Sequence, residues 1–410
     1  MLYDLHELQR SFLTPLAAFT DTGTQIFSHP YSPLAYTPVS RQIAATYELV
    51  HRLGKDYEKP AWGLPYTEIA GEQIRVTEQA IMQKPFCNLI HFERASGASS
   101  KGDPRILLVA PLSGHHATLL RDTVRTLLPA HEVYVTDWLD ARMVPLSAGP
   151  FHLNDYVRYI QDFIRLLGPD LHVISVCQPT VPVLAAISLM AADGEACLPR
   201  TMTMMGGPID TRESPTQVNR LATTKPYSWF ENNLIHRVPV RYPGAGRQVY
   251  PGFLQHAGFM AMNPDRHLRS HYDFYLDLLK GDNSDAEAHR RFYDEYNAVL
   301  DMPAEFYLDT IKVVFQEHRL PRGNWKIDGQ TVAPSAITDV ALLTIEGELD
   351  DISGQGQTRA AHDLCSGIPE QLKQHYTAPQ CGHYGIFSGR RWRETIYPKI
   401  AAFIRQPGPG

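Results

Sequence analysis

The sequence predicts an α/β fold in which a mostly parallel β-sheet is covered by helices on both faces. Short apolar runs at residues 105–110, 131–137, 171–176 and 200–205 alternate with segments of helical periodicity. This alternation stops between residues 207 and 331, and strand-like runs return at residues 341–346 and 372–378. Strands that alternate with helices are typical of parallel sheets, so we expect one sheet interrupted by a long insertion.

These patterns divide the chain into three parts. Residues 1–85 are predicted to form an N-terminal helical extension, because apolar residues recur there at helical spacing and prolines separate the pieces. Residues 86–206 and 332–410 are predicted to form the α/β core, with a first strand at residues 88–94. Residues 207–331 are rich in aromatic side chains and lack clear apolar strands, so we expect an inserted cap.

Composition and charge narrow the class of protein. The chain has 410 residues, of which 43% are apolar and 20% charged, as in an ordinary globular protein. Its net charge of −6 and the lack of a basic run argue against a nucleic-acid partner. Five scattered cysteines indicate a reducing compartment, and the sequence shows no signal peptide or apolar stretch of membrane-spanning length. We therefore expect a cytoplasmic protein without a membrane span.

Cys177 is the most informative residue. It follows the apolar run 171–176 and directly precedes a helix-like segment, which is the position of the nucleophile in a strand–turn–helix elbow. Such a turn exposes the reactive atom near a helix N-terminus, where a thiol pKa is lowered and backbone N–H groups meet a developing oxyanion. The sequence here is Ser-Val-Cys-Gln-Pro rather than G-x-S-x-G, which occurs nowhere in the chain. A buried structural thiol is the alternative.

A thiol nucleophile needs a base, and the base needs an orienting carboxylate. Asp350 lies just past the strand-like run 341–346, three residues after a glycine, and it fits the position of such an acid better than Asp351. His383 lies between glycines in the loop that follows residues 372–378. Nucleophile, acid and histidine thus occur in the order typical of the α/β-hydrolase fold. The predicted catalytic residues are Cys177, Asp350 and His383.

An oxyanion hole needs two fixed N–H donors. The backbone of Gln178 is expected to supply one, and the loop after residues 106–110 the other, from Ser113 or, as second choice, Leu112. The neighbouring pair His115 and His116 lacks Asp, Glu or Cys partners at ligand spacing, so no metal is predicted. No glycine-rich stretch matches a nucleotide-binding loop, and no cofactor is expected.

Through six motifs spread over nearly its whole length, the chain resembles the intracellular polyhydroxyalkanoate (polyhydroxybutyrate) depolymerase family. The motifs are MLYDLHELQR at residues 1–10, PLSGHHATLLR at 111–121, VTDW at 135–138, VISVCQP at 173–179, EGELDDISG at 346–354 and HYGIFSGRRW at 383–392. The resemblance implies an α/β-hydrolase with a cap and a Cys-Asp-His triad, whose family positions fall on Cys177, Asp350 and His383. The implied substrate is amorphous poly(3-hydroxybutyrate) in storage granules, with release of 3-hydroxybutyrate or oligomers.

The resemblance also implies a granule surface as partner. Some related enzymes transfer the acyl group to coenzyme A, so both water and coenzyme A remain open as acceptors. The sequence does not decide between a monomer and a homo-oligomer. An insoluble substrate requires an apolar landing surface, for which the N-terminal helices and the cap aromatics are both candidates.

Two other functions remain open at this point. A polyhydroxyalkanoate synthase also uses a cysteine elbow with Asp and His, although such enzymes usually keep a glycine where this chain has Pro179. A non-catalytic granule-associated protein with a degenerate hydrolase fold is the other alternative, and the presence of Cys177, Asp350 and His383 disfavours it.

Overall fold

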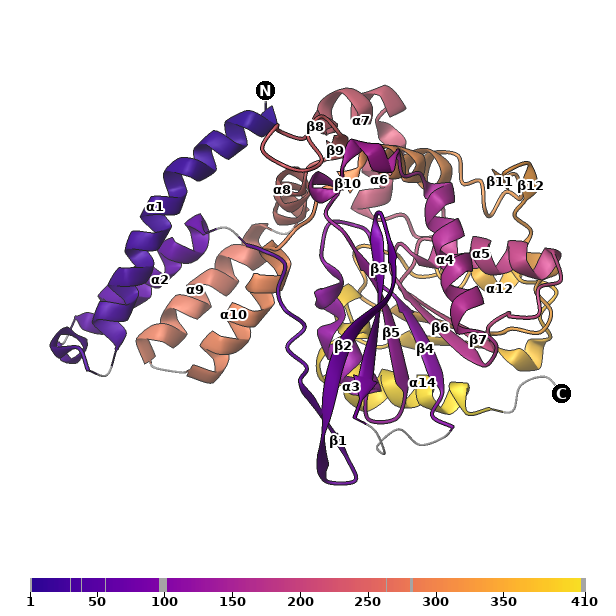
Figure 1. The fold of residues 1–410 in the computed structure, drawn as a ribbon, viewed down its shortest axis with the longest axis horizontal. Helices are drawn as coiled ribbons and strands as arrows, with labels where there is room; N and C mark the ends of the chain where they lie inside the picture. The colour runs from indigo at the N-terminus through magenta and orange to yellow at the C-terminus, as the bar shows by residue number, and fades with distance from the viewer. Residues whose placement is uncertain are drawn as a thin grey trace.

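The computed structural model describes residues 2–29, 31–37, 39–55, 57–95, 102–262, 264–280 and 283–406. A twisted sheet runs through the larger part of the molecule, and helices lie on both of its faces (Figure 1). Its strands are β1 (Tyr66–Ile69), β2 (Glu72–Lys84), β3 (Cys87–Arg94), β4 (Arg105–Val109), β5 (Glu132–Trp138), β6 (Leu171–Val176), β7 (Thr201–Met205), β13 (Ala341–Gly347) and β14 (Lys373–Ala378).

The strand order is β1-β2-β3-β5-β4-β6-β7-β13-β14. Strands β5, β4, β6, β7, β13 and β14 are parallel to one another, whereas β3 is antiparallel to both β2 and β5. One antiparallel strand near the edge, followed by the exchanged pair β5-β4 and then parallel strands in chain order, is the α/β-hydrolase fold. The prediction of this fold from the sequence is confirmed.

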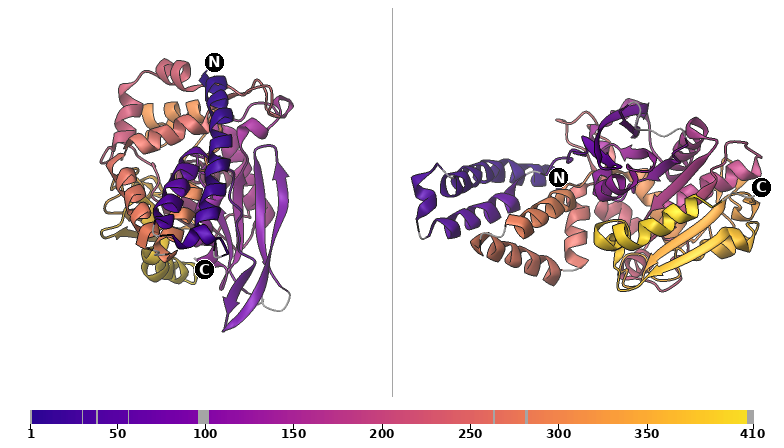
Figure 2. Two further views of the ribbon diagram at one scale, coloured as in Figure 1. Left: turned by 90° about the vertical axis from the view of Figure 1, so that its left-hand side faces the viewer. Right: turned by 90° about the horizontal axis from the view of Figure 1, so that it is seen from below.

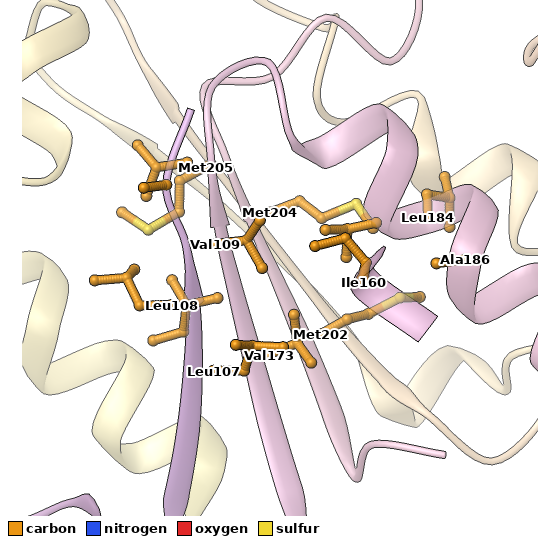
Figure 3. Packing of buried hydrophobic residues seen from close by; sticks show 14 of the residues in the cluster. Leu107, Leu108, Val109, Ile160, Val173, Leu184, Ala186, Met202, Met204 and Met205 are labelled. Carbon is orange, nitrogen blue, oxygen red and sulfur yellow. The ribbon is translucent and has the colours of Figure 1, made fainter. Parts of the chain in front are cut away.

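Burial on both faces explains why the central strands are almost wholly apolar. Every residue of β6, β7 and β13 is buried. Figure 3 shows Met204 of β7 on the face of the sheet that meets Ile160 and Leu184, while Met205 points to the opposite face. The alternation places successive side chains in two separate layers of the core.

The helices that cover this sheet come from the connections between its strands and from the segment that follows β14. They are α3 (Arg121–Leu127), α4 (Leu153–Leu167), α5 (Thr180–Ala192), α12 (Ala361–Leu364), α13 (Gly389–Arg391) and α14 (Tyr397–Ile404). Short 3-10 turns lie at Pro33–Tyr36, Ala117–Leu120, Ala141–Met143, Leu146–Ala148, Pro334–Ala336, Glu370–Leu372 and His383–Ile386, and π turns at Ile311–Gln316 and Trp392–Ile396. Helix α5 is buried along most of its length, which fits its uniformly apolar sequence.

The segment between β7 and β13 is mainly helical. Its helices are α6 (Gln217–Thr224), α7 (Tyr227–Leu234), α8 (Gly252–Met262), α9 (Pro264–Lys280), α10 (Asn283–Asn297) and α11 (Ala304–Thr310). Its strands are the short pieces β8 (His236–Arg237), β9 (Gln248–Tyr250), β10 (Met302–Pro303), β11 (Lys326–Ile327) and β12 (Gln330–Thr331), none of which joins the central sheet. We call this segment the cap.

Two N-terminal helices, α1 (Leu2–Ser28) and α2 (Ser40–Gly54), form a hairpin beside α9 and α10 (Figures 1 and 2). Ion pairs join the hairpin to α10: Arg52 Nη2 lies 3.0 Å from Asp294 Oδ1, and Glu48 pairs with Arg290. These four helices project from the α/β part as one arm. Helices α1 and α2 are therefore far from α9 and α10 in the chain, but the four form a single helical unit.

The expectation of a helical extension over residues 1–85 is wrong for its last part. Residues 66–84 form β1 and β2, which extend the sheet at its edge. Most of β2 is exposed, so it lacks the apolar alternation by which a half-buried strand is recognised. The β1–β2 turn has positive φ at Ala70 (52°) and Gly71 (84°), as tight hairpin turns require.

Candidate active site

Cys177 lies at the sharp turn between β6 and α5. Its φ of 69° places a non-glycine residue in the left-handed region, which is uncommon and strained. The turn is held on both sides: Cys177 N donates a hydrogen bond to Met205 O at 2.7 Å, and Thr180 N donates to Cys177 O at 3.2 Å. The side chain is partly exposed, whereas Cys87, Cys365 and Cys381 are buried. The alternative of a sealed structural thiol is therefore excluded by the geometry.

Two glycines after β7 provide the space around this turn. A Cβ on Gly207 would lie 1.8 Å from Thr180 Oγ1, so the chain can pass α5 only without a side chain. A Cβ on Gly206, whose φ is 55°, would lie 3.3 Å from His383 Cε1 and 3.4 Å from Asp350 Oδ2. The same backbone segment thus contacts the start of α5 and the histidine–carboxylate pair.

Asp350 lies in the loop after β13, and each of its carboxylate oxygens has a separate function. Oδ1 accepts hydrogen bonds from the backbone N–H groups of Ile352 at 2.9 Å and Ser353 at 2.8 Å. Oδ2 lies 2.7 Å from His383 Nδ1. The loop therefore fixes the orientation of the carboxylate, and the carboxylate fixes that of the imidazole.

His383 is buried at the start of a 3-10 turn that follows β14. Burial alone lowers its pKa, but the charges of Asp350 and Cys177, and the hydrogen bonds of the imidazole to both side chains, raise the pKa well above its usual value. Since Nδ1 faces Asp350, Nε2 is the nitrogen that remains for the sulfur. The structure thus brings Cys177, Asp350 and His383 together from three separate loops.

A cavity of about 510 Å³ opens at this group. The core contributes Cys177, Gln178, Ser113 and His383 to its wall. The cap contributes mainly apolar side chains, among them Val218, Leu221, Phe230, Phe259, Phe306 and Phe315. Such a chamber suits a largely apolar ligand with a few polar atoms next to the sulfur.

The two residues expected to form an oxyanion hole also line the cavity. In the described part of the chain, neither the Gln178 nor the Ser113 backbone N–H donates a hydrogen bond to another protein group. Leu112 N–H, the second choice, points to Gln178 Oε1 at 3.4 Å. Ser113 therefore has the more available donor, although the role of both residues remains a prediction.

His115 and His116 are buried and lie apart from any acidic cluster. Burial lowers the pKa of His115 to about 4 and that of His116 to about 3, so both are neutral near pH 7. His115 Nε2 lies 3.2 Å from Tyr296 O, and its ring stacks on Phe259 at a centroid distance of 4.9 Å. Within the described ranges, no group of three or more His, Cys, Asp or Glu side chains is arranged to hold a metal ion.

Sequence patterns missed the contributions of Gly206, Gly207 and the cap residues of the cavity. The Gly-Gly-Pro that follows β7 was a usable signal, because paired glycines at a strand end indicate close backbone approach. The cap side chains carried no such signal, since apolar residues on short helices look alike whether they face a core or a cavity.

Comparison with known families gives one match. Residues 206–407 match the family described as PHB de-polymerase C-terminus. The matched region contains the cap, β13 and β14, and hence both Asp350 and His383. Cys177, Gln178 and Ser113 precede it. No curated protein sequence matches the chain.

Some solved structures are similar to the chain at low sequence identity. A putative lipase from Acinetobacter baumannii AYE is 12% identical with a TM-score of 0.42, covering 80% of this chain and 92% of its own. A Paleococcus ferrophilus monoacylglycerol lipase is 12% identical with a TM-score of 0.43, covering 73% and 93%. The 2-hydroxy-6-oxo-6-phenylhexa-2,4-dienoate hydrolase of Rhodococcus sp. RHA1 is 10% identical with a TM-score of 0.46, covering 81% and 99%.

Among the described residues, no helix has the length and apolar character needed to cross a bilayer.

Proposed function

We propose that this protein is a cysteine-dependent ester hydrolase that cleaves amorphous poly(3-hydroxybutyrate) inside the cell. Cys177 is the nucleophile, His383 transfers protons and Asp350 orients and stabilises the imidazole. The observation that carries the proposal is the strained Cys177 turn, open to an apolar cavity and hydrogen-bonded to the His383–Asp350 pair. The family match over residues 206–407 supports the choice of polymer substrate.

The first half of the reaction forms a thioester. The Cys177 thiol gives its proton to His383 and the sulfur attacks the ester carbonyl, so a C–S bond forms as the carbonyl electrons move to oxygen. N–H groups of Gln178 and Ser113 stabilise this oxyanion. When the C–O bond breaks, His383 donates its proton to the leaving alcohol, and the shortened polymer departs with a free hydroxyl. The raised pKa of His383 favours this step, because the imidazole holds a proton that it can donate.

The second half releases the acid. His383, now neutral, removes a proton from a water molecule that attacks the thioester carbonyl; the C–S bond breaks, the acid leaves, and the Cys177 thiolate regains the proton held by His383. A thioester is more reactive than the original oxygen ester, so water can cleave the intermediate and regenerate the enzyme. The product is 3-hydroxybutyrate or a short oligomer, depending on where along the polymer the first attack occurs.

Mass spectrometry of the intact protein tests the proposal. After brief exposure to a soluble 3-hydroxybutyrate trimer, we expect a mass increase of one or more hydroxybutyryl units, which peptide mapping places on Cys177. The Cys177→Ala protein, with an unchanged fold by circular dichroism, should show neither adduct nor acid release. Full ester cleavage by Cys177→Ala would disprove the proposed nucleophile, and no cleavage of the trimer by the wild type would disprove the proposed substrate class.

A further inference from the structure

Helix α1 packs on the rest of the protein through its small and polar residues. The residues on its protein-facing side are Tyr3, Glu7, Ala17, Thr20 and Gly23, all buried. A Cβ on Gly23 would lie 2.5 Å from Tyr47 Cδ2, so α1 and α2 are in close contact there. At the first turn, Tyr3 Oη donates a hydrogen bond to Asp301 Oδ2 at 2.6 Å. This side of the helix therefore buries few large apolar groups.

Most of the large apolar residues of α1 are exposed instead, although Phe19 also contacts Tyr47 of α2, with 6.2 Å between the ring centroids. The exposed residues recur at steps of three or four residues along most of the helix, and they are 42–72% exposed. We call this set the α1 stripe; its members are Leu2, Leu5, Leu8, Phe12, Leu16, Phe19 and Ile26. An amphipathic surface helix normally turns such residues toward the core, so the pattern of α1 is reversed.

The size of the stripe is unusual for a free surface. By side-chain area, the exposed parts of these seven residues amount to on the order of 700 Å², whereas the largest apolar patch on a typical monomer is a few hundred Å². A patch of this size marks a contact with another apolar body. The stripe follows one helix of 27 residues, roughly 40 Å long at 1.5 Å per residue, and thus suits an extended surface.

The charges on α1 narrow the class of partner that the α1 stripe can contact. From Ser11 to Ser28 the only charged residue is Asp21, and exposed positions there between the stripe residues include uncharged polar ones such as Thr22 and Gln25; the charged residues Asp4, Glu7 and Arg10 lie in the first turns. Helices that bind anionic lipid bilayers carry Lys and Arg on their polar face. Helices that pair with a second copy usually carry charges beside the apolar seam to set partner and register. Neither pattern is present over residues 11–28.

The arm also connects the stripe to the cavity. Helix α2 packs on α9, which follows α8, and Phe259 of α8 lines the cavity (Figures 1 and 2). The arm is therefore adjacent in the chain to α8, which forms part of the cavity wall.

We propose that the α1 stripe is the docking surface for an uncharged, apolar polyester phase. This inference rests on the proposed function, because it assigns the polymer a binding face outside the catalytic cavity. Docking through the stripe raises the local concentration of ester chains at the cap without occupying the cavity itself.

The test compares binding with catalysis in variants that alter only exposed side chains. Binding to artificial amorphous poly(3-hydroxybutyrate) particles is measured by co-sedimentation in a Cys177→Ala background, so that hydrolysis does not erode the particles. Catalysis is measured with Cys177 present, on the soluble 3-hydroxybutyrate trimer. The test variant is Phe12→Gln/Phe19→Gln, and Leu5→Gln/Leu8→Gln is a second one in case the first misfolds. The control is Leu166→Gln/Val240→Gln, whose residues are 48% and 94% exposed outside α1.

We expect at least a tenfold loss of particle binding in either stripe variant, with trimer hydrolysis within twofold of the wild type and no loss in the control. If the stripe variants bind the particles as well as the protein with an unaltered stripe does, the α1 stripe is not the docking surface. The catalytic proposal would be unaffected by that result. Failure of the wild type to cleave the trimer would instead defeat the proposed function. A wild-type dimer that the stripe changes dissociate, or tight binding to phosphatidylglycerol vesicles, would assign the stripe to a second copy or a membrane.

Discussion

Asp350 and His383 are joined by a contact of 2.7 Å between Oδ2 and Nδ1, although 33 residues separate them in the chain. The second oxygen of Asp350 is occupied by the N–H groups of Ile352 and Ser353, so the carboxylate cannot rotate without losing two hydrogen bonds. This arrangement sets which imidazole nitrogen faces Cys177. Burial lowers the pKa of His383, but the negative charge of Asp350, together with Cys177 and the hydrogen bonds to both side chains, raises the pKa well above its usual value.

Replacing Asp350 with asparagine should therefore affect catalysis far more than folding. The amide oxygen can still accept the two backbone hydrogen bonds, but the charge that stabilises the imidazolium is lost. We expect kcat on the soluble trimer to fall by about 10³–10⁴-fold, with an unchanged circular dichroism spectrum. The neighbouring Asp351, whose side chain is exposed, is the matched control, and Asp351→Asn should keep kcat within twofold. Similar losses in both variants would contradict the assignment of Asp350.

The pH dependence of catalysis should change in a defined direction. Because the charge of Asp350 raises the pKa of His383, the wild-type imidazole keeps its proton to a higher pH than an ordinary histidine would. In the residual activity of Asp350→Asn, the alkaline limb of the kcat profile should therefore move to lower pH. A pH–rate series on the trimer measures this, and a shift to higher pH, or none, would show that Asp350 does not control the proton on His383.

The central strands and the order of the site residues could be predicted because strong local signals mark them. A buried parallel strand is a nearly continuous apolar run, and a polar residue at its end stands out, as Cys177, Asp350 and His383 do. Distances between the loops could not be predicted in this way. They depend on contacts between segments remote in sequence, such as Gly206 against His383 and Gly207 against Thr180.

The N-terminal region shows the opposite situation. Helical periodicity indicated α1 correctly, but periodicity does not say which face packs on the protein, and here the apolar face is the exposed one. Strand β2 was missed because an edge strand exposed on most of its length has no apolar pattern. Its pairing with β3 comes from backbone hydrogen bonds, to which side-chain hydrophobicity contributes little.

Alkylation should distinguish Cys177 from the other thiols. Cys177 and Cys197 are both partly exposed, but burial and the adjacent Glu195 carboxylate raise the pKa of Cys197. Iodoacetamide at pH 7 should therefore modify Cys177 first, and loss of trimer hydrolysis should follow that modification one to one by peptide mass spectrometry. Faster labelling of Cys197, or inactivation without a label on Cys177, would contradict this expectation.

Gly207 should tolerate no side chain unless Thr180 is also reduced. In Gly207→Ala the new methyl would meet Thr180 Oγ1 at 1.8 Å and Cγ2 at 2.4 Å, so the start of α5 must move. We expect a loss of about 1–3 kcal/mol in the free energy of unfolding and a fall in kcat, because Cys177 moves with the turn. The double variant Gly207→Ala/Thr180→Gly also removes Thr180 Cβ, which lies 2.5 Å from the new methyl, and should recover part of both. Additive losses in this double-mutant cycle, measured by urea denaturation, would show that the two sites do not interact.

Asp140 gives a prediction for stability against pH. Burial first, and then the charge of Asp301, raise its pKa to about 7, while Arg142 partly opposes the shift. Because the folded-state pKa lies above the unfolded value near 4, the folded protein binds the extra proton between these values. The stabilisation is therefore complete below about pH 4 and is lost as the pH rises through about 7.

The variant Asp140→Asn removes this titration but can keep the hydrogen bonds that Asp140 Oδ1 accepts from Arg142 N and Asp301 N. Between pH 5 and 8, the free energy of unfolding of the wild type should fall relative to that of the variant, by on the order of 3 kcal/mol. Urea denaturation at several pH values measures the difference and cancels the titration of groups that do not interact with Asp140. A difference that stays constant over this range would show that Asp140 is ionised throughout, with Arg142 as the dominant influence on its pKa.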